Sequence, residues 1–121
     1  MFEVMVKGGF SAAHQLREYP GKCEALHGHN WTVEVTVRSG KLNELDMVMD
    51  FTELKESLGK VLGRLDHKLL NELKPFDKLS STSENVAKYV FDEMRKTLSA
   101  YEIAWVRVWE SDDSAATYYG R

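Results

Sequence analysis

The chain has 121 residues, of which 43% are hydrophobic and 29% charged, and its formal net charge is -3. These values predict one globular domain over residues 1–121 and exclude a disordered or fibrous protein. Lysine and arginine form no cluster, so a nucleic-acid partner has no electrostatic support. The first residues alternate apolar and polar, so we expect neither a signal peptide nor a membrane span, and we expect a cytoplasmic protein.

Strands are predicted first, from the alternation of apolar and polar residues. One strand covers residues 2–14, with a glycine bulge expected at residues 8–9. A second strand covers residues 31–38, where valines alternate with polar side chains. We expect these two strands to pair antiparallel across a loop at about residues 15–26.

Two helices follow in the middle of the chain. The first begins at Asp50, a capping residue, and its apolar stripe reaches Leu65 at helical spacing. The second begins among the hydroxyl residues 81–83, which precede an acidic first turn, and its stripe reaches Leu98. Pro75 lies in the connection between them.

Alternation returns near the C-terminus. Ala104, Val106 and Val108 are expected on one side of a third strand, with Ile103 and two tryptophans on the other. The turn signal at residues 112–113 precedes a last strand through residues 118–119. The order is therefore ββααββ, an α+β fold in which two helices cover one face of a four-stranded antiparallel sheet.

Both edges of such a sheet would be unpaired. Proteins usually pair or cover exposed edges, because free edge strands promote aggregation. We therefore expect a homo-oligomer in which sheets join edge to edge.

Histidines are concentrated in one region. Three of the four, His14, His27 and His29, lie within sixteen positions. On an extended backbone, the two-residue spacing points the rings of His27 and His29 to the same side, and His14 can approach them across the hairpin. Three nitrogen ligands with a vacant fourth position are typical of catalytic zinc. The alternative is three unrelated histidines, one in the core and two in a loop.

A second group consists of Cys23, Asp66 and His67. A thiol, a histidine that takes its proton and a carboxylate that orients the ring would form an activated base or nucleophile. A single cysteine is otherwise a small buried hydrophobic residue, and Asp66 with His67 would equally suit a polar helix end.

Three further polar residues are candidates for binding a ligand. Glu110 closes an apolar strand, where a carboxylate could accept two parallel hydrogen bonds from a heterocycle or simply be solvated. Thr82 and Ser83 have a complete explanation as a helix cap, so only outside support would give them a ligand role.

Together these segments resemble the 6-pyruvoyl tetrahydropterin synthase family. The resemblance covers nearly the whole chain in order and rests on five segments: Phe10-Ser11-Ala12-Ala13-His14, Cys23 with His27-Gly28-His29-Asn30, Leu65-Asp66-His67, Thr82-Ser83-Glu84-Asn85, and Glu110. It implies the tunnelling fold. It also implies an oligomer, commonly a hexamer of two stacked trimers, with active sites between subunits.

The resemblance also implies a role for each candidate residue. His14, His27 and His29 would bind Zn²⁺, and Cys23 would act as the catalytic base, linked to His67 and Asp66. Glu110 would anchor a pterin substrate, and Thr82 and Ser83 are grouped with it as substrate-binding residues.

The spacing between Cys23 and His27 separates branches of the family. The gap of three residues resembles that of the 6-carboxytetrahydropterin synthases of queuosine biosynthesis, whereas animal 6-pyruvoyl enzymes carry an insertion there. The implied lyase converts 7,8-dihydroneopterin triphosphate to 6-carboxytetrahydropterin, acetaldehyde and triphosphate. A folate-pathway branch has glutamate in place of the cysteine, so Cys23 argues against that branch. The alternatives are a 6-pyruvoyltetrahydropterin synthase and a non-catalytic pterin-binding module stapled by zinc.

Overall fold

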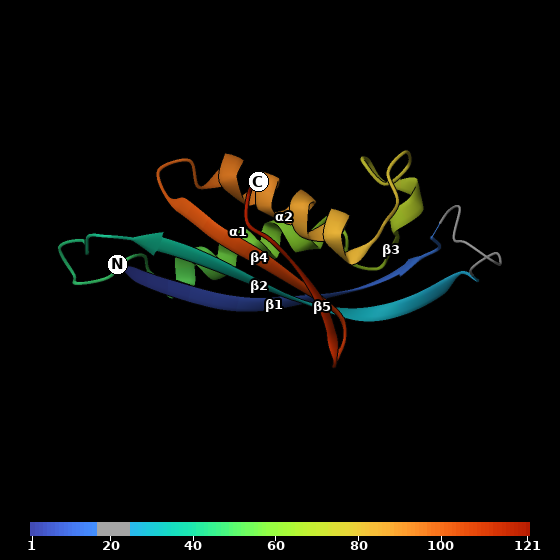
Figure 1. The fold of residues 1–121 in the computed structure, drawn as a ribbon, viewed down its shortest axis with the longest axis horizontal. Coiled ribbons are helices and arrows are strands. Elements are labelled where there is room, and N and C mark those ends of the chain that lie inside the picture. Colours follow the sequence, from blue (N-terminus) through green and yellow to red (C-terminus); the bar gives the residue numbers. More distant parts are fainter. Residues whose placement is uncertain (17–24) are drawn as a thin grey trace.

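The fold is given by a computed structural model, which describes residues 1–16 and 25–121. The elements follow the chain as β1 (Phe2–His14), β2 (His27–Ser39), α1 (Phe51–Gly63), β3 (Lys68–Leu69), the short 3-10 helix η1 (Leu70–Glu72), α2 (Ser83–Thr97), β4 (Glu102–Ser111) and β5 (Ser114–Tyr118). Figure 1 shows the long strands as one twisted layer with both helices on the same side of it.

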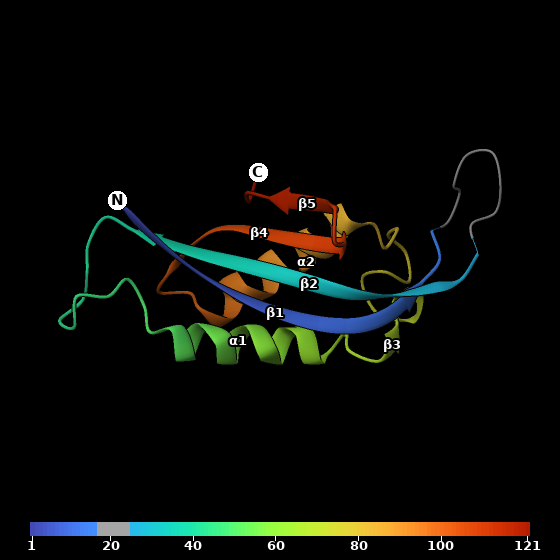
Figure 2. The same cartoon turned by 90° about the horizontal axis from the view of Figure 1, so that it is seen from below.

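The strands form one sheet in the order β3-β1-β2-β4-β5. Helix α1 packs mainly against β1, and α2 packs against β4 and β5. Figure 2 shows α1 running alongside β1, with α2 behind β2 and β4. The predicted α+β architecture is confirmed.

The prediction of four antiparallel strands is wrong in one respect, because the sheet has five strands. The additional strand, β3, pairs parallel with the end of β1, with Lys68 opposite Ala12 and Leu69 opposite Ala13. Two residues are too few to show any periodicity in a sequence.

The glycine bulge predicted in the first strand is also wrong. β1 and β2 pair without interruption, with Gly8 opposite Val33. Packing explains this glycine, since a Cβ atom there would lie 2.9 Å from Leu62 Cδ1 and 3.1 Å from Leu58 Cδ2 of α1. The glycine therefore allows a helix to approach the strand closely.

Irregular pairing occurs instead in β4. The register against β2 shifts between Thr36 and Val37, which places Ile103 opposite Val37. Ile103 therefore lies in the hydrophobic core. The alternation had predicted it on the opposite face, with Trp105. A second irregularity, in the pairing of β4 with β5, lies between Trp109 and Ser111.

Both helices begin at the predicted caps. Asp50 accepts a hydrogen bond from the Thr52 amide at 2.8 Å, and Thr82 accepts one from the Asn85 amide at 3.2 Å. Their apolar stripes fill the space against the sheet; deeply buried members include Leu54, Leu58, Val61, Val86, Val90 and Met94. None of the helices within the described ranges is long and apolar enough to cross a membrane.

Candidate functional site

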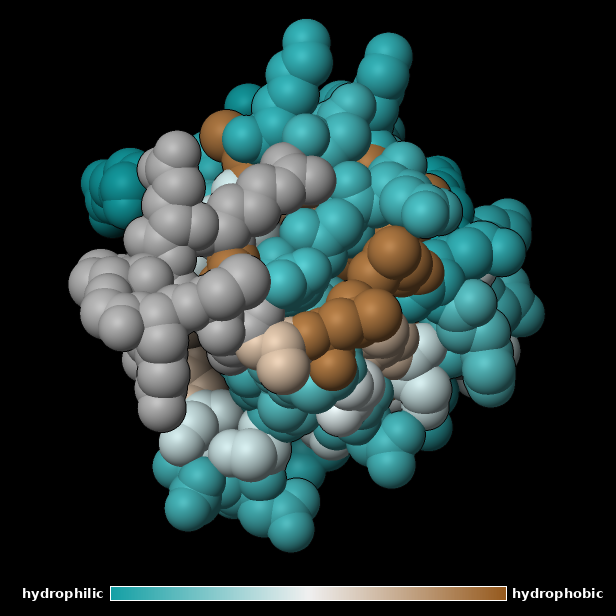
Figure 3. All heavy atoms as spheres, turned by 90° about the vertical axis from the view of Figure 1, so that its right-hand side faces the viewer, coloured by the Kyte–Doolittle hydropathy of each residue, from teal (hydrophilic) through white to brown (hydrophobic). Residues whose placement is uncertain are grey.

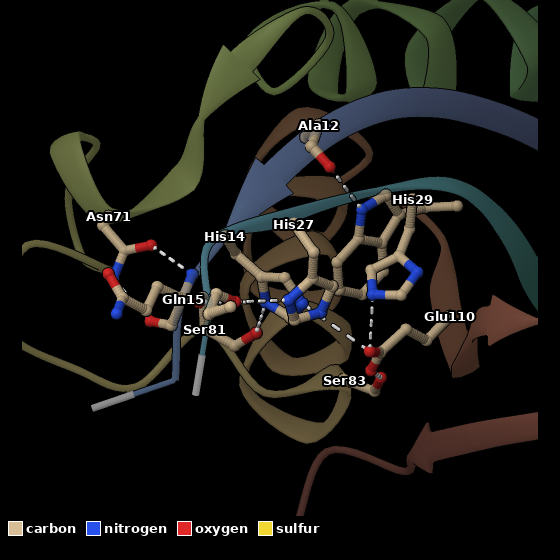
Figure 4. A network of polar contacts seen from close by, with 11 residues as sticks. Ala12, His14, Gln15, His27, His29, Asn71, Ser81, Ser83 and Glu110 are labelled. Carbon is tan, nitrogen blue, oxygen red and sulfur yellow. Dashed lines mark hydrogen bonds and ion pairs between the residues drawn. The ribbon is translucent and has the colours of Figure 1, made fainter. Parts of the chain in front are cut away.

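Three histidines meet where β1 ends and β2 begins. His14 lies directly opposite His27, and Ala12 lies opposite His29, so all three rings project from one face of the hairpin. The ring centroids are 4.8 Å apart for His14 and His27, 5.2 Å for His14 and His29, and 4.6 Å for His27 and His29. Figure 4 shows the three side chains turned toward one another.

The environment of His14 fixes which ring nitrogen is available. The ring is fully buried, and its Nδ1 lies 2.9 Å from the Ser81 carbonyl oxygen. Since a carbonyl only accepts, Nδ1 carries the proton and Nε2 presents its lone pair. This Nε2 atom has no hydrogen-bond partner among the residues that the structure describes.

His27 is oriented in the same way. Its Nδ1 lies 2.8 Å from the carbonyl oxygen of Ala25, which again leaves Nε2 as the lone-pair atom. Metal-binding histidines characteristically donate their other N–H to a carbonyl or carboxylate, which fixes the ring for coordination.

Glu110 completes this group from β4. Its Oε1 atom lies 2.8 Å from His29 Nε2 and 3.6 Å from His14 Nε2. Ser83, the first residue of α2, donates its hydroxyl to Glu110 Oε2 at 3.0 Å. One ligand atom from each of the four residues lies within 4.8 Å of the others. Three imidazoles and a carboxylate are a suitable donor set for a divalent ion such as zinc.

Asp66 and His67 form a second polar pair, held against β1. Asp66 Oδ1 accepts the Ser11 amide at 2.9 Å, and its Oδ2 lies 3.0 Å from His67 Nδ1. The Ser11 N–H, and to a lesser extent His67, lower the pKa of the Asp66 carboxyl below its ordinary value. The Asp66 side chain is therefore a carboxylate at neutral pH, and it accepts a hydrogen bond from the protonated Nδ1 of His67.

The backbone of His67 is unusual. Its φ angle is 58°, in the left-handed region that few residues other than glycine adopt. Its amide donates to the Ser11 carbonyl oxygen at 2.6 Å, while its side chain is 82% exposed. Two hydrogen bonds to Ser11 thus hold a conformation that presents the ring to solvent.

Two cavities adjoin His29. One, of about 530 Å³, is lined by His29, His67, Ser11 and Asn30 among others. The other, of about 540 Å³, is lined by His29, Ser83, Glu110 and residues of β5. Figure 3, which views this end of the molecule, shows a mostly hydrophilic surface crossed by a short hydrophobic strip. Each volume suits a small molecule.

Most of the predicted site residues are therefore found in two neighbouring groups. His14, His27, His29, Glu110 and Ser83 form the first, and Asp66 and His67 form the second. Thr82 caps α2 with its hydroxyl. Cys23 lies outside the described residues. Sequence reasoning missed Ser81, which orients His14; its hydroxyl had indicated only a helix cap.

Comparison with known proteins supplies the family context. Residues 3–121 match the family model described as 6-pyruvoyl tetrahydropterin synthase. An Archaeoglobus fulgidus protein, provisionally named 6-carboxy-5,6,7,8-tetrahydropterin synthase, is 41% identical over 96% of both chains. The Drosophila melanogaster 6-pyruvoyl tetrahydrobiopterin synthase is 38% identical over 92% of this chain and 75% of its own. The Caenorhabditis elegans 6-pyruvoyl tetrahydropterin synthase structure superposes with a TM-score of 0.87, at 31% identity, over 99% of this chain and 96% of its own.

Proposed function

Because the chain belongs to the 6-pyruvoyl tetrahydropterin synthase family, and is therefore a lyase of pterin chemistry, we propose that it is a zinc-dependent 6-carboxy-5,6,7,8-tetrahydropterin synthase. It would convert 7,8-dihydroneopterin triphosphate and one water molecule to 6-carboxytetrahydropterin, acetaldehyde and triphosphate, in the pathway to queuosine. The observation that carries the proposal is the convergence of His14, His27 and His29, with lone pairs of His14 and His27 facing inward, beside a separate Asp66–His67 pair.

The three histidines would hold the zinc ion. Ser81 and Ala25 support this role, because their carbonyl oxygens fix the tautomers of His14 and His27. When bound, the ion would polarise the substrate's side-chain hydroxyl groups and stabilise the negative charge that develops as a carbon-bound proton leaves.

The proton itself would be handled by this chain's own side chains. Cys23 would remove it from carbon as the general base, and His67 would accept it in turn. Asp66 supports this step, since its lowered pKa keeps it ionised and its Oδ2 holds the proton of His67 on Nδ1. The Nε2 atom of His67 is then the one that accepts.

Glu110 would recognise the pterin ring. A carboxylate accepts two parallel N–H bonds from a heterocycle, and the cavity beside Glu110, Ser83 and β5 has a volume of about 540 Å³. Ser83 would contribute by holding Oε2 of this carboxylate, at 3.0 Å. Thr82 would serve indirectly, since its cap begins the helix that carries Ser83.

The active form would be a homo-oligomer built of trimers, with sites between subunits. One observation supports this: most of β1 forms an edge of the sheet beyond the short pairing with β3, and β5 forms the opposite edge. The 82% exposure of the His67 side chain suits a residue that a neighbouring subunit covers.

A second product deserves consideration because the Drosophila relative is named as a 6-pyruvoyl enzyme and is nearly as similar as the archaeal one. The deciding experiment incubates the zinc-loaded protein with 7,8-dihydroneopterin triphosphate and measures product mass and released acetaldehyde. We expect 6-carboxytetrahydropterin with one acetaldehyde for each turnover. A pyruvoyl side chain with no acetaldehyde would replace the proposal with the 6-pyruvoyl activity.

His67→Asn tests the proposed proton acceptor. Asparagine tolerates the left-handed backbone at this position and can still hydrogen-bond Asp66, but it accepts no proton at neutral pH. We expect kcat to fall by about 10²-fold, with zinc content and melting temperature unchanged. Lys60→Gln, a change of an exposed residue on α1, is the control. Wild-type turnover by His67→Asn would contradict the role.

A further inference from the structure

The helix-free face of the sheet carries a row of polar side chains. Lys7, Glu34, Arg107 and Thr117 lie opposite one another on β1, β2, β4 and β5. Contacts between side chains connect three of its members. Arg107 Nε donates to Thr117 Oγ1 at 2.8 Å, and Arg107 NH1 lies 3.8 Å from Glu34 Oε1.

Glu34 is the least exposed member of this row, with 7% of its surface accessible. Its Oε2 atom accepts a hydrogen bond from Trp109 Nε1 at 2.7 Å, the shortest side-chain bond within this network. A nearly buried carboxylate needs such partners, because an ionised group without them is costly to remove from water. The bond fixes the indole of Trp109 against β2.

Trp109 immediately precedes Glu110, at the point where the strand pairing is irregular. Trp109 lies opposite Ala115 and Ser111 lies opposite Ser114, so the register shifts across Glu110. Such irregularities can redirect a side chain. Trp109 is bonded to Glu34 on one side of Glu110, and the Ser111 hydroxyl donates to Asp113 at 2.9 Å on the other.

We propose that Trp109 and Glu34 are positioning residues, which aim the Glu110 carboxylate at the histidine group and the adjoining cavity. Neither residue contacts the cavity that Glu110 shares with Ser83, so they act through Glu110. The part of this inference that concerns pterin binding rests on the proposed function. The part that concerns the direction of the Glu110 carboxylate is independent of it.

The test compares two tryptophans on the same face. Trp109→Phe removes the N–H donor to Glu34 and keeps an aromatic ring. Trp105→Phe makes the same change at a tryptophan that contacts Arg107, whose guanidinium carbon lies 4.5 Å from the ring centroid, and it serves as the control. Glu34→Gln keeps an oxygen acceptor for the indole and serves as the conservative variant. Binding of neopterin to each protein is measured by calorimetry, in the wild-type and Glu110→Gln backgrounds.

We expect Trp109→Phe to weaken neopterin binding about 10-fold in the wild-type background and to have no further effect in Glu110→Gln. Trp105→Phe and Glu34→Gln should bind as the wild type does. Equal losses in both backgrounds, no loss from Trp109→Phe, or the same loss from Trp105→Phe would overturn the proposal.

Crystal structures of the metal-free proteins supply a readout that is independent of pterin binding. The distance from Glu110 Oε1 to His29 Nε2 is 2.8 Å. We expect this distance to persist in Trp105→Phe and to lengthen beyond about 4 Å, the limit for an ion pair, in Trp109→Phe. An unchanged distance in Trp109→Phe overturns the proposal. A wild-type protein that binds no neopterin would count against the pterin function alone.

Discussion

His14→Ala is expected to abolish zinc binding at the site and, with it, turnover. The substitution removes one of three proposed nitrogen ligands, the one whose ring is fully buried and held by Ser81. Loss of an orienting partner alone typically costs a metal site 10- to 100-fold in affinity, so loss of the ligand should cost more than about 100-fold. Since the ion would supply several kcal/mol of charge stabilisation, kcat should fall by about 10³-fold or more. Zinc affinity is measured by chelator competition, and turnover by product formation.

A buried residue also contributes to packing, so stability needs its own control. Melting temperatures of the metal-free wild-type and His14→Ala proteins isolate the packing loss, because neither then contains the ion. His67→Asn, which leaves the three histidines intact, should retain full zinc content. Normal zinc affinity in a folded His14→Ala protein would show that the histidines are not the ligands.

Cys23→Ala is expected to have the second largest effect. As the proposed general base, the thiol should contribute about 10²- to 10⁴-fold to kcat, and its removal should leave folding and zinc content unchanged. This combination also separates an enzyme from a module in which zinc only staples the hairpin loop. In such a module Cys23 would be a packing residue, and its removal would lower stability.

Cys23→Ser is the matched variant for this test, since a hydroxyl is similar in size but far less acidic than a thiol. We expect it to be nearly as inactive as Cys23→Ala. Turnover within a few-fold of the wild type in both variants would show that Cys23 is not the general base, and His67 would be the next candidate.

The histidine cluster was predictable because local rules place all of its members. Strand alternation puts His27 and His29 on one face, and the hairpin brings His14 opposite them, as the observed register confirms. The helix starts were predictable for the same reason, since Asp50 and Thr82 cap through amides two or three residues away.

Features that depend on distant segments were not predictable. Ser81 orients His14 from 67 positions along the chain, and no spacing rule links the two. The proximity of Glu110 to His29 likewise depends on the order of strands in the sheet and on an irregular register in β4. Gly8 was misinterpreted because the close approach of Leu58 and Leu62 that requires it is visible only once α1 is packed.

The two-residue strand β3 has a consequence for how the fold tolerates change. Through β3 and the Ser11 hydrogen bonds, the segment that carries Asp66 and His67 is fastened to the same strand that ends in His14. The spacing between His67 and the histidine cluster is therefore fixed by the single strand β1. The exposed stretch from Gly40 to Met47 lies outside this connection, so residues inserted there should leave that spacing unchanged, and it is a suitable place for a tag or a second domain.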